Sequence, residues 1–230
     1  MADKKTPFGG KVSNRTAQVK QRVKTARRRS AQSARWLERH LNDPYVQRAQ
    51  EDGYRSRAAY KLIELDEKFG FLKGRKAVVD LGAAPGGWAQ VIRRQLPKAA
   101  VVGIDLLPVD AIEGAVLLEM DFMDDDAPAR LIAELGQSPD LVISDMAANT
   151  VGHKQTDHLR TMGLVEAAAD FAMDVLPPGG HFVSKAFAGG TDGPLLKLLR
   201  NNFQSVKNAK PPSSRKGSVE WYLVAMGRKG

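Results

Sequence analysis

A lysine interrupts a short apolar stretch between glycines in "GGHFVSKAFAGG", residues 179–190. The stretch is typical of a buried strand, where an unpaired ammonium group costs several kcal/mol. One interpretation places Lys185 at the strand's end, where its long stem carries the charge to water. The other makes Lys185 a reactive group, because a lysine in such a place can hold or move a proton.

A second candidate site is the glycine-rich segment "DLGAAPGG", residues 80–87. It follows an apolar strand and precedes a helical pattern. Its glycines let the backbone approach a ligand closely, and the helix offers its N-terminus. Asp105 ends the next apolar strand about 20 residues further on, where an acidic side chain can bind the hydroxyl pair of a ribose. The spacing predicts a nucleotide cofactor.

The order of residues in this loop favours S-adenosylmethionine over NAD. A dinucleotide loop usually has the pattern G-x-G-x-x-G, whereas here Asp80 precedes the first glycine and a proline lies within the loop. Asp80 suits a cationic ligand better than a diphosphate. Asp121, at the end of a third apolar strand, could accept a hydrogen bond from the adenine amine. Structural alternatives are that Asp80 caps the helix and that Asp121 opens a turn.

Strands and helices alternate along the chain, which predicts an α/β fold with a doubly wound, mostly parallel sheet and an antiparallel last strand. An N-terminal helix is expected from about Ser56, as N-cap, to Phe69, with Gly70 as C-cap. The other expected helices begin at the glycine-rich turn, at "DAPARLIAELG", at "TMGLVEAAADFAMDVL" and at "GPLLKLLRNNF". The expected strands are "KAVVDL", "AVVGIDLLP", "AVLLEMDF", "PDLVISDMA", residues 181–187 and "EWYLVAMGR".

The positive charge lies at one end of the chain. The 230 residues carry a net charge of +9, but residues 1–50 hold 13 Lys and Arg against 3 Asp and Glu. We expect residues 1–34 to be a basic, disordered arm and residues 35–230 to form one domain. Such an arm suits a polyanion, with nucleic acid as the main candidate and a solubilising tail as the alternative.

Composition also excludes several mechanisms. The chain has no cysteine, so disulfides, thiolate zinc sites and cysteine nucleophiles are excluded. The N-terminus lacks the apolar segment of a signal peptide, and no apolar run approaches the roughly 18 residues of a membrane span. A cytoplasmic protein is therefore expected. The four histidines show no metal-ligand spacing, and we interpret them as surface or loop residues.

Five ordered motifs resemble the FtsJ/RrmJ family of ribose 2′-O-methyltransferases, over a span from about Arg35 to the C-terminus. They are "GYRSRAAYKL", "DLGAAPGGWAQ", "SDMAANTVGHKQTDH", "GGHFVSKAF" and "PPSSRKGSVEWYLVA". The resemblance implies a class I methyltransferase fold that transfers a methyl group from S-adenosylmethionine to a ribose 2′-oxygen. In the bacterial large-subunit branch of the family, that ribose belongs to a uridine in the A loop of 23S rRNA.

The resemblance also implies the site residues. The family's catalytic K-D-K-E pattern falls on Lys61, Asp145, Lys185 and Glu220, and its cofactor residues fall on Gly86, Trp88, Asp105, Asp121 and Asp145. One hypothesis makes Lys185 the base, with like-charge repulsion from Lys61 favouring its neutral form. In the other, Lys185 stays charged and orients the 2′-hydroxyl while water or Asp145 takes the proton. The residues alone leave both open.

Three other functions remain as alternatives. One is an RNA-binding ribosome-assembly factor that uses the fold without catalysis, one is a 2′-O-methyltransferase acting on tRNA or a cap ribose, and one is an NAD-dependent oxidoreductase. The chain shows no compact RNA-binding module, so RNA contacts would come from the arm and from the basic residues of "GYRSRAAYK" and "SSRKGS". No metal is expected, and a monomer is the default expectation.

Overall fold

The fold was analysed in a computed structural model of the chain. It describes residues 37–38, 40–148, 152–187, 193–215 and 217–230. The expected basic arm, residues 1–34, lies outside these residues. The chain divides into two compact units, residues 1–47 and 48–230, and the second contains the sheet. Helix α2 (Pro44–Glu51) spans the boundary between them.

Seven strands form one sheet in the order β3-β2-β1-β4-β5-β7-β6. Six of them run in one direction, and β7 is antiparallel to both of its neighbours, as the sequence predicts. The bounds are β1 Ala77–Leu81, β2 Ala100–Asp105, β3 Ala115–Glu119, β4 Leu141–Ser144, β5 His181–Phe187, β6 Phe203–Ala209 and β7 Glu220–Arg228. The expected doubly wound α/β fold is confirmed.

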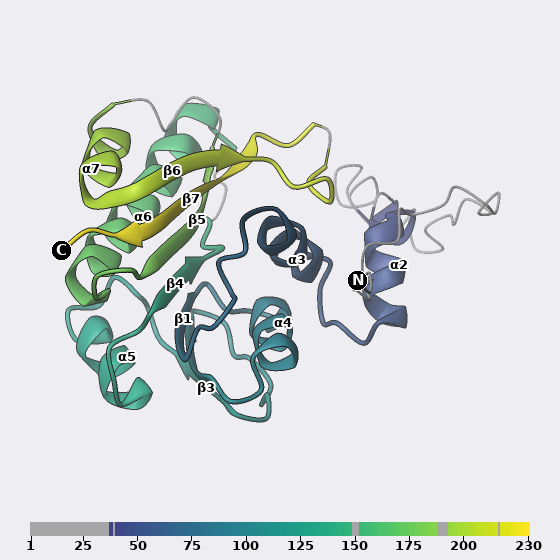
Figure 1. Ribbon diagram of the computed structural model, residues 1–230. Helices are drawn as coiled ribbons and strands as arrows, with labels where there is room; N and C mark the ends of the chain where they lie inside the picture. The colour runs from purple at the N-terminus through teal and green to yellow at the C-terminus, as the bar shows by residue number, and fades with distance from the viewer. Residues whose placement is uncertain (1–36, 39, 149–151, 188–192, 216) are drawn as a thin grey trace, which may run out of the picture. The chain divides into compact units, whose positions relative to one another are not determined.

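Helices cover both faces of the sheet, with α3 and α4 on one face and α5, α6 and α7 on the other (Figure 1). Their bounds are α3 Ala58–Phe69, α4 Gly87–Gln95, α5 Ala127–Leu135, α6 Lys154–Val175 and α7 Pro194–Asn202. Strands β1 and β4 are buried along their whole length because both of their faces are covered. This explains their continuous apolar sequences.

Strand β6 is absent from the expectations drawn from the sequence. Its residues "FQSVKNA" bury only the first and last positions, because β6 is the outer strand and pairs with β7 alone. An edge strand needs little apolar surface, so its sequence carries little of the period-2 pattern by which strands are recognised.

Two helix starts also differ from the expectations. Ser56 is not an N-cap: α3 begins at Ala58, and no side chain caps it. Gly70 does close α3, in the left-handed conformation and with its N–H bonded to the Asp66 carbonyl. Helix α6 begins at Lys154, earlier than expected, because the His153 side chain accepts a hydrogen bond from the Thr156 N–H. None of the described helices is long and apolar enough to cross a bilayer.

Phe182 packs in the core between β5 and the layer of helices α5, α6 and α7, and its substitution tests how much this packing stabilises the fold. Its side chain is fully buried there. Phe182→Ala is expected to lower the free energy of unfolding by about 3–5 kcal/mol, because it removes a buried ring and leaves a cavity. Urea unfolding measures the loss. Leu198→Ala, at a position 38% exposed, is the control and should cost less than about 1 kcal/mol. Equal costs for the two variants would contradict this description of the core.

Candidate active site

Lys185 lies near the carboxyl end of β5 and is only 6% exposed. Its Nζ is 3.3 Å from Oδ1 of Asp145, the residue that follows β4, and it also donates a hydrogen bond to the Asp145 backbone carbonyl. The interpretation in which its stem carries the charge to water is therefore wrong. The buried ammonium is held by an ion pair at the carboxyl edge of the sheet.

The environment of Asp145 keeps it ionised. Burial raises its pKa, but the charges of Lys185 and Lys61 and a hydrogen bond from Tyr222 together outweigh burial and hold the pKa below its ordinary value of 3.8. The Tyr222 hydroxyl donates to Asp145 Oδ1 at 2.8 Å. Tyr222 is the direct neighbour of Lys185 across β5 and β7, so the strand register sets this contact. The sequence analysis did not single out Tyr222 as a site residue.

Lys61 and Glu220 form a second ion pair next to the first. Lys61 Nζ is 3.2 Å from Glu220 Oε2 and 5.7 Å from the centre of the Tyr222 ring. Lys61 comes from α3, whereas Glu220 is the first residue of β7. Because β7 is antiparallel to β5, its first residue lies at the same edge of the sheet as the carboxyl ends of the parallel strands. The structure thus brings all four K-D-K-E residues together.

The connection from β6 to β7 fastens α3 to the sheet. The backbone N–H of Ser213 donates to Glu64 Oε2 at 2.7 Å, and the Arg57 guanidinium donates to the Ser213 carbonyl. Arg57 and Glu64 flank Lys61 along α3. The same connection leads into Glu220, so one segment positions both partners of the Lys61–Glu220 pair.

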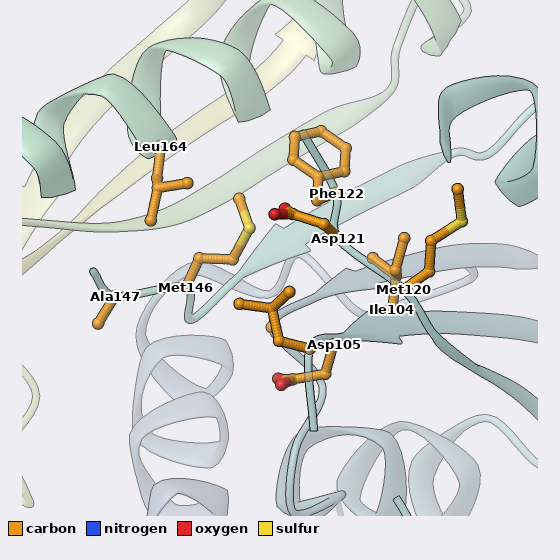
Figure 2. A pocket seen from close by; sticks show the side chains of 10 residues that line it. Ile104, Asp105, Met120, Asp121, Phe122, Met146, Ala147 and Leu164 are labelled. Atoms are coloured by element: carbon orange, nitrogen blue, oxygen red, sulfur yellow. The ribbon is translucent and has the colours of Figure 1, made fainter. Parts of the chain in front are cut away.

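A pocket lies beside the four residues, at the carboxyl ends of β1 to β4. Its lining residues are Gly82, Ile104, Asp105, Leu106, Met120, Asp121, Phe122, Met146, Ala147 and Leu164. In Figure 2 the carboxylates of Asp105 and Asp121 both point toward the side where Met146 and Ala147 lie. The pocket combines two carboxylates with mostly apolar walls, and it stands where open α/β sheets bind their ligands.

Both carboxylates also order the loops that carry them. Asp105 accepts hydrogen bonds at 2.9 Å from the backbone N–H groups of Ala84 and Leu107, which ties the glycine-rich loop to the end of β2. Asp121 accepts from the N–H of Met123 at 2.9 Å, so it does open a turn, as one alternative has it. It lines the pocket as well.

Two residues implied by the resemblance stand outside the pocket lining. Gly86 caps α4 with φ at 105°, a conformation that glycine adopts at little cost. Trp88 is 3% exposed, donates its indole N–H to the Ala58 carbonyl and packs against the Tyr222 ring. In this position Trp88 joins α3, α4 and β7. Its contact with a cofactor stays a prediction.

Asp80 is the most unusual carboxyl group of the site. It is fully buried at the end of β1, and neither oxygen has a hydrogen-bond partner among the described residues. Burial, with the charges of Asp145 and Asp105, raises its pKa from 3.8 to about 8. Gly86 rather than Asp80 caps α4, so the helix-capping alternative is wrong. The residues around Asp80 favour its neutral form, which a cationic ligand nearby would reverse.

The histidines are only partly as expected. His158 lies half-buried in α6 and stacks on Phe187, and His181 lies half-buried in β5 with Nδ1 accepting from the Gly227 N–H. The interpretation as a surface or loop residue is therefore wrong for His181, which lies within the sheet, whereas His158 is a surface residue of α6 as expected. Within the described ranges, no cluster of His, Asp and Glu side chains is suited to hold a metal ion.

Comparison with known proteins identifies the family. Residues 54–228 match the FtsJ-like methyltransferase family. The chain belongs to that family. Two curated relatives named ribosomal RNA large subunit methyltransferase E are similar along nearly their whole length. The Erythrobacter litoralis protein is 71% identical over 91% of this chain and 95% of its own, and the Sphingopyxis alaskensis protein is 68% identical over 96% of each.

A solved structure supports the same assignment. The crystal structure of a ribosomal RNA methyltransferase from Plasmodium falciparum superposes with a TM-score of 0.69 at 34% identity, covering 77% of this chain and 100% of that one. This FtsJ-like methyltransferase therefore has both the sequence and the fold of its family. The family match begins at residue 54, inside the second compact unit.

Asp80 gives a pH-dependent stability. Its pKa is about 8 in the folded chain and near 3.8 when unfolded, so between these values the folded protein keeps a proton that the unfolded chain has lost. The contribution of Asp80 to the free energy of unfolding is therefore greatest below pH 4 and falls by up to about 1.4 kcal/mol per pH unit toward pH 8. Asp80→Asn removes this loss. In urea unfolding from pH 5 to 8, the free energy of unfolding of the variant should therefore rise relative to that of the wild type as the pH increases.

Asp125→Asn, at an exposed aspartate, is the control and should follow the pH profile of the wild type. Parallel profiles for Asp80→Asn and the wild type would show that Asp80 does not titrate in this range.

Gly82 tests the close approach of two loops at the pocket. Its φ is +81°, and a Cβ there would lie 2.8 Å from the Met146 backbone nitrogen. Gly70 has a φ of +69° with open space around it, so Gly70→Ala reports the backbone strain alone. We expect Gly70→Ala to cost about 1–2 kcal/mol in urea unfolding and Gly82→Ala at least twice as much. Equal costs would mean that the loops separate freely.

Proposed function

We propose that the protein transfers a methyl group from S-adenosylmethionine to the ribose 2′-hydroxyl of a uridine in 23S rRNA of the large ribosomal subunit. The observation that carries the reaction is the buried pair of Lys185 and Asp145, which stands beside a pocket with two carboxylates. The substrate class follows from the relatives, which are named large-subunit methyltransferases and cover nearly the whole chain.

The pocket suits S-adenosylmethionine chemically. Asp105 and Asp121 offer carboxylate oxygens for ribose hydroxyls and the adenine amine, and Ile104, Met120 and Phe122 offer apolar contacts for the adenine ring. The buried, unpartnered carboxyl group of Asp80 is neutral in the structure as described, and a cationic ligand nearby would favour its ionised form and so gain a negative partner. Gly86 would let the backbone approach the ligand, and Trp88 would fix the position of the loop. When bound, S-adenosylmethionine supplies a methyl group on a positively charged sulfur. A hydroxyl oxygen can attack this methyl carbon, and the sulfur then leaves as a neutral thioether.

The ion pairs favour a charged Lys185 that orients the substrate. Asp145 is ionised, and it accepts from both Lys185 and Tyr222, so the ammonium is fixed in direction. A fixed ammonium group can hold the 2′-oxygen with one N–H and stabilise negative charge as that oxygen becomes a nucleophile. The proton leaves to the Asp145 carboxylate or to water. Lys61 contributes through its charge, which also lowers the pKa of Asp145. Glu220 holds Lys61 in place through their ion pair.

An RNA substrate is consistent with the charge distribution. The first fifty residues carry 13 Lys and Arg against 3 Asp and Glu, and this excess would lead the enzyme to phosphate. We further propose that the protein works as a monomer in the cytoplasm, where large subunits are assembled. The desolvation of the Lys185–Asp145 ion pair costs stability, which a factor that only binds RNA would not need to give up.

Lys185 can be tested directly. Large ribosomal subunits that lack the modification are incubated with labelled S-adenosylmethionine, and the methylated nucleoside is identified. We expect 2′-O-methyluridine from the wild type and a rate at least about 100-fold lower for Lys185→Met, because the oriented ammonium is lost. Lys68→Met, on the exposed side of α3, is the matched control and should keep the wild-type rate.

Full turnover by Lys185→Met would exclude both roles considered for this lysine. Binding of S-adenosylmethionine without any transfer to large subunits would point to another RNA, and tRNA would be tested next.

A further inference from the structure

Two aromatic side chains stack at the carboxyl edge of the sheet outside the four ion-paired residues. The rings of His158 and Phe187 have centroids 6.0 Å apart and planes at 30°. His158 comes from the first half of α6, and Phe187 is the last residue of β5. Both side chains are half-buried, whereas the phenylalanines at the centre of the core, such as Phe182, are fully buried. The pair is thus part of the surface near the active site.

The register of the strands places Phe187 beside the catalytic groups. It follows Lys185 by two residues, so both side chains point to the same face of β5. Phe187 is also directly opposite Glu220 across β5 and β7, and opposite residues on neighbouring strands have Cβ atoms about 5 Å apart. Phe187, the strand member of the stacked pair, is therefore next to Glu220 of the Lys61–Glu220 ion pair.

The strand order sets the sequence in which the pocket, the Lys185–Asp145 pair and Phe187 follow one another along this edge of the sheet. The pocket lies at the ends of β1 to β4, Lys185 and Asp145 lie at β5 and β4, and Phe187 and Glu220 lie at β5 and β7. A substrate that presents its hydroxyl to Lys185 from the side away from the pocket would meet Phe187. Two residues of a strand span roughly 6.6 Å, which is comparable with the width of a nucleoside.

We propose that His158 and Phe187 form the stacking surface for the base of the nucleotide whose ribose is methylated. The proposal rests on the proposed function and adds where that base is held. An unpaired base presents a flat π face, and proteins that bind single-stranded RNA hold such bases on Phe and His rings. Stacking tolerates any base, so this surface holds the nucleotide in place without identifying it as a uridine.

Variants of Phe187 separate stacking from apolar packing. Phe187→Leu keeps an apolar side chain without a π face, and Phe187→Trp keeps the π face. We expect Phe187→Leu to raise KM for large subunits at least fivefold, with kcat and the Kd of S-adenosylmethionine within twofold of the wild type. Phe187→Trp should keep KM within twofold. His158→Leu should follow Phe187→Leu. Leu159→Ala, at a position 68% exposed on α6, is the control.

A rise in KM below fivefold in Phe187→Leu overturns the proposal. So does an equal defect in Phe187→Leu and Phe187→Trp, because then the shape of the phenylalanine matters rather than its π face.

A binding titration tests the surface without turnover. Indole fluorescence of Phe187→Trp is measured as an eight-nucleotide oligouridylate is added, with the wild type and its three tryptophans as the reference. Quenching beyond that of the wild type is expected, because a base stacks on the new indole. Absence of this extra quenching overturns the proposal. If the wild type methylates no large subunits, the proposed function fails, while this titration still decides on the stacking surface.

Discussion

The ion pair between Lys185 and Asp145 is the interaction on which the site depends. Two charges removed from water are stable only when they meet each other and their remaining hydrogen bonds are made. Here the Asp145 carboxylate pairs with the Lys185 ammonium and accepts a hydrogen bond from the Tyr222 hydroxyl. The Asp145 backbone carbonyl accepts a further hydrogen bond from Lys185. These contacts require β4, β5 and β7 to be adjacent and in one register. The ion pair therefore depends on the strand order and register in this part of the sheet.

The second ion pair depends on contacts that are distant in sequence. Lys61 and Glu220 are separated by 159 positions and meet because the β6–β7 connection is fastened to α3 through Ser213, Glu64 and Arg57. Helix α3 thus contributes to the candidate active site, although it lies outside the strand ends that usually form sites in this fold. The reversed direction of β7 allows a residue at the start of a strand to join residues at the ends of others.

The strands and the position of the pocket could be predicted because buried parallel strands leave strong apolar patterns, and their acidic ends share one edge. Strand β6 could not be predicted, since an edge strand buries only the ends of "FQSVKNA". Lys61 and Glu220 were available only through the family resemblance, because no local pattern records a contact across 159 positions. The hydrogen bond of Tyr222 to Asp145 depends on strand register, and the stacking of His158 on Phe187 depends on where α6 packs. Neither can be read from the local pattern of a single sequence.

The crowding at Gly82 has a consequence for redesign of this enzyme. Gly82 leaves no room for a Cβ against Met146, and Met146 directly follows Asp145. The loop that borders the pocket and the residue that pairs with the Lys185 ammonium group are therefore adjoining parts of one close contact. A substitution that widens the pocket at Gly82 will therefore also shift Met146 and Asp145, so selection for variants with a wider pocket has to permit compensating changes around β4.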